Sequence, residues 1–434
     1  MYNVSSYVEN LIKNGKHFCI LPWIHFHAWP NGKVMPCCVA DSSKPVASAS
    51  EHESIINMLN TEEYKKMRVE MLYDKPVEAC RRCYELEDLG TWTMRQSHNS
   101  MKGLANIDLV DDTNEDGSID QFKMKYMDIR FSNLCNMKCR TCGPECSSLH
   151  AQEFVQKRKG SQALFNYFKM KSTMVSVNED GRFFEMLEPY LADVEEVYFA
   201  GGESLQTQEH YDSLEYWINN NLTSQVDLTY TTNFGSLKFK QKDLVELWKK
   251  FPKIKIWASL DDLGDRAELI RKGTDWEIIE DNIRLIKKEI PHAEFGITPT
   301  ISIYNVFTYP KFFEYLLGQN LISESVPPRI NLLTNPWWSN IQILPDKIKQ
   351  VLIYKYQIYR SKYYHNEHIR NGFALIQNNL MQGSAIFANH ISKESKKGIL
   401  EFIEYNDEMD KIRREKIVDI IPELREVYEW AQSL

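Results

Sequence analysis

From residue 126 the chain alternates short apolar runs with segments whose apolar residues recur every three or four positions. The short runs are typical of buried strands, and the longer spacing is typical of amphipathic helices. Repeats of strand, helix and strand need crossover connections and therefore predict a parallel sheet. The apolar runs are YMDIRFS (126–132), VEEVYFA (194–200), VDLTYTT (226–232), IKIWASL (254–260), EFGITPTI (294–301) and RINLLT (329–334). This periodicity fits both a partial barrel and a doubly wound sheet.

The size and charge of the chain limit the number of domains and the kinds of partner that we expect. Its 434 residues are too many for one small core, so we expect one large domain and a smaller one. The net charge of -8, from 52 basic and 60 acidic residues, makes nucleic acid an unlikely partner. No stretch has the pattern of a signal peptide or a membrane span, so we expect a cytoplasmic protein with no membrane partner.

Three regions follow from these patterns. Residues 1–120 hold five of the nine cysteines, residues 121–335 carry the strand and helix alternation, and residues 336–434 have mostly helical patterns. In the first region, two short strands are predicted on either side of a turn at Pro30, Asn31 and Gly32.

Two other features of the amino-terminal region have ordinary explanations. His25 and His27 alternate on the first predicted strand, where we expect them to pack or to form hydrogen bonds. The acidic run at 111–120 begins like an EF-hand loop, but Lys123 occupies the place of its bidentate glutamate, so a solvated turn is expected.

The cysteines carry the chemistry. In a reducing cytosol, clustered thiols are more often metal ligands or catalytic groups than disulfides. Cys135, Cys139 and Cys142 form CxxxCxxC directly after the first parallel strand, at the edge where active sites of such sheets gather. Three thiolates leave one position open, whereas a structural zinc site usually closes with four ligands. We expect Cys146 to be a packing thiol at the start of the next helix.

At this spacing the sequence resembles the radical S-adenosylmethionine (SAM) enzymes. The resemblance implies a partial (β/α)6 barrel in which Cys135, Cys139 and Cys142 hold a 4Fe-4S cluster with one open iron. It also implies that SAM binds this iron and is cleaved by one electron, giving a 5'-deoxyadenosyl radical that abstracts hydrogen from a substrate.

A second motif supports the resemblance. FAGGES contains Gly201 and Gly202, which allow close approach of the backbone, and Glu203, which can accept hydrogen bonds from an ammonium group. It resembles the GGE element that binds the SAM amino group in this family.

Weaker matches follow along the predicted barrel. Asn233 in TTNFG, and Ser259 and Asp261 in SLDD, resemble residues that contact the SAM ribose. Arg271 in IRKGTDWE resembles the arginine that meets the SAM carboxylate, a task that suits its bidentate geometry. Taken singly, each of these residues fits strand-end capping or an ion pair equally well. Thr141 departs from the family, which often has an aromatic residue before the third cysteine.

The upstream cysteines form a second group. Cys80 and Cys83 make a CxxC half-site, which is used by zinc and by iron-sulfur clusters. The region resembles the auxiliary-cluster region of twitch-type radical SAM proteins, a reduced SPASM module, although here it precedes the barrel. The resemblance implies a second 4Fe-4S cluster on Cys19, Cys37, Cys80 and Cys83, with Cys38 able to replace Cys37. Structural zinc is the alternative.

The predicted function is therefore a radical SAM enzyme acting on a peptide or a small polar molecule. We expect SAM and two 4Fe-4S clusters as cofactors, and an electron donor such as flavodoxin or ferredoxin as a partner. The auxiliary cluster is expected to transfer electrons. No catalytic acid or base is identified by the sequence. The alternatives are a zinc-stabilised binding protein and a degenerate radical SAM fold that binds SAM without cleaving it.

Overall fold

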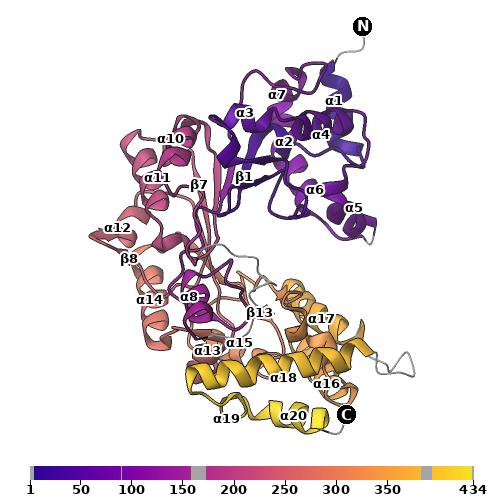
Figure 1. The fold of residues 1–434 in the computed structure, drawn as a ribbon, viewed down its shortest axis with the longest axis vertical. Helices are drawn as coiled ribbons and strands as arrows, with labels where there is room; N and C mark the ends of the chain where they lie inside the picture. The colour runs from indigo at the N-terminus through magenta and orange to yellow at the C-terminus, as the bar shows by residue number, and fades with distance from the viewer. Residues whose placement is uncertain (1–3, 89, 158–172, 383–392, 433–434) are drawn as a thin grey trace. The chain divides into compact units, whose positions relative to one another are not determined.

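The computed structural model describes residues 4–88, 90–157, 173–382 and 393–432 (Figure 1). The chain forms two compact units, and neither is one continuous stretch of sequence. The first unit comprises Met1–Leu134, Met174–Thr229 and Lys250–Lys253. The second unit comprises Cys135–Thr173, Tyr230–Lys249 and Ile254–Leu434.

The first unit contains a five-stranded arrangement in the order β6-β4-β1-β2-β3. Its strands are β1 (His25–Ala28), β2 (Lys33–Met35), β3 (Ala47–Ser48), β4 (Tyr126–Ile129) and β6 (Glu196–Phe199). β4 is parallel to both β1 and β6, whereas β2 is antiparallel to β1 and β3. The predicted hairpin is confirmed, with Gly32 at a φ of 79° in its turn. Because β1 pairs in parallel with β4, the cysteine-rich region adds one strand to the parallel part of this arrangement.

Short helices surround these strands. They are α1 (Val4–Asn14), α2 (Leu21–Ile24), α3 (Ile55–Leu59), α4 (Glu62–Leu72), α5 (Arg81–Asp88), α6 (Met94–His98), α7 (Ile107–Asp111), α10 (Arg182–Leu187) and α11 (Gln208–Asn219). Two of these helices, α3 and α4, are separated by a break at Asn60 and Thr61. The break occurs because Thr61 caps α4, its side chain accepting a hydrogen bond from the Tyr64 amide.

The two histidines of β1 have structural partners, as expected. His25 Nδ1 lies 2.9 Å from the Tyr126 carbonyl and His27 Nδ1 lies 2.6 Å from the Asp128 carbonyl. Burial lowers the pKa of His25 to about 3, so its imidazole is neutral and donates from Nδ1. The acidic run at 111–120 forms the expected turn, in which Asp116 accepts a hydrogen bond from the Ser118 amide.

The second unit contains the remaining parallel strands. β10 (Ile254–Ala258) pairs in parallel with β12 (Glu294–Ile297), and β13 (Thr300–Ile301) pairs in parallel with β14 (Asn331–Leu332). β7 (Asp227–Thr232) begins in the first unit and ends in the second. Each of the six predicted apolar runs contains an observed strand, and the run at 294–301 contains two, β12 and β13. The predicted α/β class with parallel strands is confirmed, while the closure into a partial barrel stays a prediction.

Short antiparallel pairs complete the strands of the second unit. β5 (Lys138–Cys139) pairs with β11 (Arg271–Lys272), and β8 (Lys238–Phe239) pairs with β9 (Lys242–Asp243). The first of these pairs carries a predicted iron ligand, Cys139, opposite a predicted SAM contact, Arg271.

The carboxyl-terminal part is helical, as expected. The helices of this unit are α8 (Ser148–Lys157), α12 (Leu244–Trp248), α13 (Gly264–Ile270), α14 (Trp276–Glu289), α15 (Tyr309–Gly318), α16 (Asp346–Lys362), α17 (Glu367–Gln382), α18 (Lys393–Arg413), α19 (Ile417–Ile420) and α20 (Arg425–Gln432). Phe373 on α17 contacts the rings of Phe313 on α15 and Tyr356 on α16, with centroid separations of 5.8 and 6.1 Å. The late helices therefore share a core with a helix of the alternating region.

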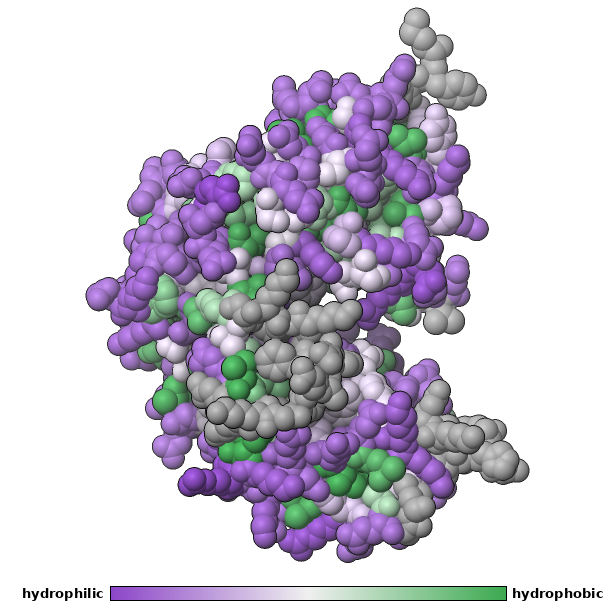
Figure 2. Space-filling model, viewed as in Figure 1, coloured by the Kyte–Doolittle hydropathy of each residue, from purple (hydrophilic) through white to green (hydrophobic). Residues whose placement is uncertain are grey.

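Hydrophilic residues cover most of the face seen in Figure 2, and hydrophobic residues form small separate groups on it. In the described ranges, every helix is too short or too polar to cross a bilayer.

Candidate functional site

The CxxxCxxC loop forms a small buried cluster in the second unit. Cys135 and Cys139 are buried and pack with Met137, and Cys142 packs against them. The Ser147 hydroxyl donates to the Met137 carbonyl at 2.6 Å, which fixes the middle of the loop. The three predicted iron ligands therefore lie together.

A guanidinium lies beside the middle cysteine. Cys139 is the direct cross-strand partner of Arg271 in the β5–β11 pair, and Arg271 Nη1 lies 4.0 Å from Cys139 Sγ. A hydrogen bond from Cys142 and the charge of Arg271 lower the pKa of Cys139 to about 7, against the effect of burial. The same hydrogen bond raises the pKa of Cys142 well above its usual value. A thiolate is thus favoured at Cys139, and a thiolate is the form that ligates iron.

Arg271 is held in place by Asp261. Arg271 Nε donates to Asp261 Oδ2 at 2.7 Å, and the Thr300 amide donates to the other carboxylate oxygen at 2.8 Å. The Asp261 side chain is fully buried. Burial disfavours the charged form of Arg271, but the neighbouring carboxylate of Asp261 outweighs this effect and raises the pKa of Arg271. Asp261 therefore positions the arginine in this structure, and its predicted ribose contact remains a prediction.

Asn233 also contacts the cysteine loop. Its amide nitrogen donates to Asn136 Oδ1 at 2.7 Å and lies 4.0 Å from Cys135 Sγ. Its amide oxygen accepts a hydrogen bond from the Gly235 backbone. Ser259 directly follows β10, and its amide donates to the Thr232 carbonyl at 2.7 Å. Of the four residues predicted to contact SAM, Asn233 approaches Cys135, Arg271 approaches Cys139, and Asp261 holds Arg271.

The GGE segment belongs to the first unit. A β-carbon on Gly202 would lie 2.4 Å from the Leu134 carbonyl oxygen, which leaves room only for glycine. The Glu203 amide donates to the same oxygen at 2.7 Å. Its side chain is 3% exposed and accepts a hydrogen bond from the Leu205 amide. The glycines were predicted to allow close approach to a ligand. In the structure, Gly202 lets the loop pack against the chain just before Cys135.

The second cysteine group surrounds one small cavity in the first unit. Cys19, Cys37, Cys80 and Cys83 line it together, next to Met94 and Arg95. Cys38 is absent from this lining, and its Sγ lies 3.9 Å from Met94 Sδ. Of the two candidates that the sequence left open, the structure brings Cys37 to the other three thiols.

The residues at this cavity fit a polynuclear cluster. All nine cysteines are free thiols. The four upstream thiols surround a space, which suits an iron-sulfur cluster with one thiolate on each iron.

Burial makes three of these thiols, Cys19, Cys37 and Cys80, costly to ionise. Burial and the neighbouring cysteines raise the pKa of Cys19 and of Cys37 to about 12 each, and the pKa of Cys80 lies well above its usual value. Thiolates gathered in such a cavity need a nearby positive charge, which a bound metal centre supplies.

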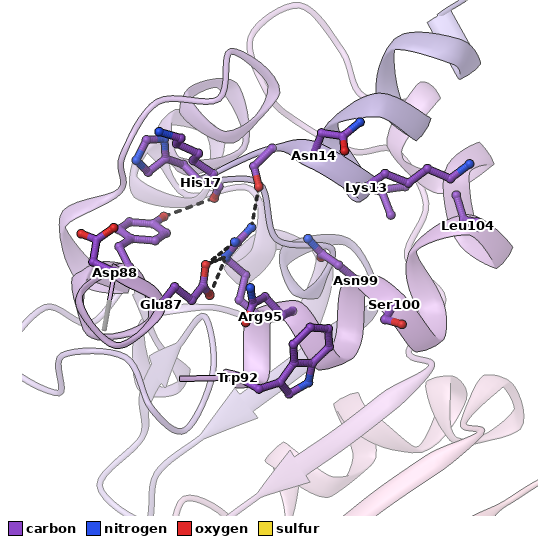
Figure 3. Close-up of a pocket in the computed structure, with 15 residues that line it drawn as sticks. Lys13, Asn14, His17, Glu87, Asp88, Trp92, Arg95, Asn99, Ser100 and Leu104 are labelled. Atoms are coloured by element: carbon purple, nitrogen blue, oxygen red, sulfur yellow. Dashed lines mark hydrogen bonds and ion pairs between the residues drawn. The ribbon is translucent and has the colours of Figure 1, made fainter. Parts of the chain in front are cut away.

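Arg95 and Asn99 support this cavity and were missed by the sequence analysis. Arg95 also lines a separate, larger pocket of about 610 Å³. Figure 3 shows it there, bonded to Glu87. Arg95 Nη1 donates to the Phe18 carbonyl at 2.8 Å, and Asn99 bonds the Phe18 carbonyl and the Ile20 amide at 2.9 Å each. The two side chains therefore hold the backbone on both sides of Cys19.

The sequence does contain a signal for the helix that carries Arg95. Thr93 and Gln96 form a capping box that starts α6, the helix that carries Arg95. The pattern T-x-x-Q could have placed the helix start, although not the partners of Arg95.

Replacing Gly202 with alanine tests the close contact after β6. The new β-carbon would press on backbone, so we expect a loss of about 1–3 kcal/mol in the free energy of unfolding, measured by urea titration. Gly318→Ala is the control because a β-carbon there has no atom within 4 Å. Equal stabilities of the two variants would contradict the assigned contact.

Arg95→Met tests the support of the second cavity. It leaves Glu87, whose side chain is 13% exposed, without its cation. We expect a loss of about 3–5 kcal/mol in the free energy of unfolding. The matched control is Arg81→Met, which removes an exposed ion pair with Glu85 and should cost less than about 1 kcal/mol. A similar small loss for both variants would show that Arg95 is not structural.

Comparisons with solved structures give partial matches. Native anSMEcpe with bound AdoMet and Cp18Cys peptide is 15% identical, with a TM-score of 0.36 over 53% of this chain and 58% of that chain. Native anSMEcpe with bound AdoMet is 18% identical, with a TM-score of 0.36 over 54% and 59%. A histidine-tagged form of anSMEcpe with bound AdoMet is 16% identical, with a TM-score of 0.38 over 56% and 60%. The chain thus spans less than two thirds of these neighbours.

No curated protein matches the chain. Residues 19–84 match the family named SPASM, an iron-sulfur cluster-binding domain. This segment contains Cys19, Cys37, Cys80 and Cys83, the four thiols that line the cavity. The predicted resemblance to SPASM-type proteins is confirmed over this segment, since residues 19–84 are similar to the iron-sulfur cluster-binding domain of the SPASM family.

Proposed function

We propose that this protein is a radical SAM enzyme with two 4Fe-4S clusters. The observation that carries the proposal is the buried loop in which Cys135, Cys139 and Cys142 lie together, with Arg271 paired across from Cys139. Three thiolates can ligate three irons and leave the fourth iron without a protein ligand. The SPASM match of residues 19–84 supports the second cluster.

Each residue near the loop has a task in this proposal. Arg271 offers a planar guanidinium that can bind the SAM carboxylate, and Asp261 orients it through Nε. Asn233 donates a hydrogen bond to the side chain of Asn136, which lies in the loop. A cluster bound to the three cysteines would supply the electron that splits the SAM sulfonium, and the 5'-deoxyadenosyl radical so formed would take a hydrogen atom from the substrate.

The auxiliary cluster would be held by Cys19, Cys37, Cys80 and Cys83. Four protein thiolates leave no iron open, so substrate cannot ligate this cluster without displacing a cysteine. Transfer of electrons is therefore the role that the ligand set favours. Glu203, with Gly201 and Gly202 beside it, would bind the SAM amino group.

The remaining parts of the proposal concern the setting of the reaction. We propose a partial barrel fold, a cytoplasmic location, a flavodoxin or ferredoxin as electron donor, and a peptide or a small polar molecule as substrate. The negative net charge of the chain agrees with a substrate other than nucleic acid.

Anaerobic reconstitution with iron and sulfide tests the activity. We expect about eight irons per chain and formation of 5'-deoxyadenosine from SAM and a reductant. Cys139→Ala should stay folded, retain about four irons and form no 5'-deoxyadenosine. Binding of zinc alone would support a zinc-stabilised binding protein. Two bound clusters without SAM cleavage would support a degenerate fold.

A pair of neighbouring variants tests the auxiliary ligand set. In Cys37→Ser the cavity loses one of its four thiols, so we expect the iron content to fall by about half after reconstitution. Cys38→Ser should keep the iron content of the parent protein because its side chain is outside the cavity lining. The reverse result would assign the ligand to Cys38.

A further inference from the structure

Two buried arginines join the CxxxCxxC loop to the carboxyl-terminal helix α18. The first is Arg140, which lies inside the loop and whose side chain is fully buried. Its guanidinium donates to Asn406 Oδ1 at 2.6 Å, to Asp410 Oδ1 at 2.6 Å and to Glu415 Oε2 at 3.0 Å. Asn406 and Asp410 lie on α18, and Glu415 follows its end. These hydrogen bonds join residues about 270 positions apart in the sequence.

The second arginine reaches the loop from the helix. Arg413 is the last residue of α18, and its side chain is 1% exposed. Its guanidinium donates to the Lys138 carbonyl at 2.8 Å and to Glu153 Oε2 at 2.9 Å. Lys138 precedes Cys139, and its ammonium group also lies 3.0 Å from Glu153. The backbone on both sides of Cys139 is therefore attached to α18.

Glu415 extends these contacts to the neighbouring strand. Besides Arg140, its carboxylate pairs with Lys272 on β11 at 2.7 Å. β11 also carries Arg271, the cross-strand partner of Cys139. The chain turns sharply after α18, with Arg414 at a φ of 56°, and the Ile417 amide donates to Asp410 Oδ2 at 2.7 Å. The turn places Glu415 where it meets Lys272 on β11 and Arg140, which directly follows β5.

We propose that the end of α18 is a clasp that positions the cysteine loop for its metal centre. The clasp consists of Asn406, Asp410, Arg413 and Glu415. A buried charge is costly without its partner, so the loop cannot leave α18 without uncovering Arg140 and breaking its ion pairs. The effect on a cluster rests on the proposed function, whereas the contacts of the clasp do not.

This role differs from general stabilisation of the fold. The clasp contacts the loop through the Lys138 carbonyl and the Arg140 side chain, on either side of Cys139. Loss of one contact should therefore loosen residues 136–142 before it affects distant parts of the unit. Arg140 and Arg413 are positioning residues, since they act on the metal centre through the backbone of the loop.

Hydrogen exchange of the full-length apoprotein tests the clasp directly. In Arg413→Gln, we expect amides within 136–142 to exchange about tenfold faster than in the parent protein. Lys411→Gln is the matched control because it also removes a cation from the last turn of α18, and Lys411 is exposed. We expect exchange within about twofold of the parent in this control. Equal exchange in both variants would overturn the clasp.

A second readout connects the clasp to the metal centre. In a Cys80→Ala, Cys83→Ala background, the upstream cavity keeps only Cys19 and Cys37 of its four thiols, so a reconstituted cluster should form at the downstream cysteines. We expect Arg413→Gln to lose this iron to a chelator about tenfold faster than Lys411→Gln. Arg413→Lys keeps the charge and should restore part of the retention.

The outcomes separate the two proposals. Faster exchange with unchanged iron loss would overturn the positioning role. If the background protein binds no iron at these cysteines, the proposed function fails, while the exchange experiment still decides whether the clasp exists. Circular dichroism monitors folding, and Arg413→Lys replaces Arg413→Gln in the exchange experiment if the latter does not fold.

Discussion

The pairing of β5 with β11 is the contact on which the candidate site depends. It sets Cys139 directly opposite Arg271, so that a thiol and a guanidinium share a buried environment. A guanidinium stabilises a neighbouring thiolate and, with its remaining donors, suits a carboxylate. The proposed reaction needs ligation of iron and binding of SAM. The residues proposed for these two roles, Cys139 and Arg271, face each other in this short strand pair. Asp261 holds the arginine, and the clasp on α18 holds the cysteine.

The cysteine-rich region has to hold four thiols close together around one cavity. Three of the four thiols around this cavity are difficult to ionise, because burial raises the pKa of Cys19, Cys37 and Cys80. The region is held together by buried charge pairs and carbonyl contacts rather than by disulfides, with Arg95 and Glu87 as the main pair. A scaffold of this kind can keep the cavity shaped for a cluster that has no open iron. The upstream group has four thiols and would leave no iron open in its proposed cluster. The CxxxCxxC loop has three and would leave one iron open.

The sequence predicted the elements better than the contacts between them. Apolar periodicity located the six strand regions from residue 126 onward and the hairpin at Gly32, because those signals are local. Spacing alone identified CxxxCxxC, but it could not separate Cys37 from Cys38, since neighbouring residues differ only in the direction of their side chains. Arg140 and Arg413 were not predicted at all. Their partners lie far away in the sequence, and no local pattern encodes such a contact.

The central claim is that one cluster is open to SAM and the other is closed. Electron paramagnetic resonance of the reduced, reconstituted protein, recorded as SAM is added, tests it most directly. The account predicts two cluster signals, of which only one shifts with SAM, and predicts that the shifting signal is absent in Cys139→Ala. A SAM-dependent shift that survives in Cys139→Ala, or two signals that both ignore SAM, would contradict it.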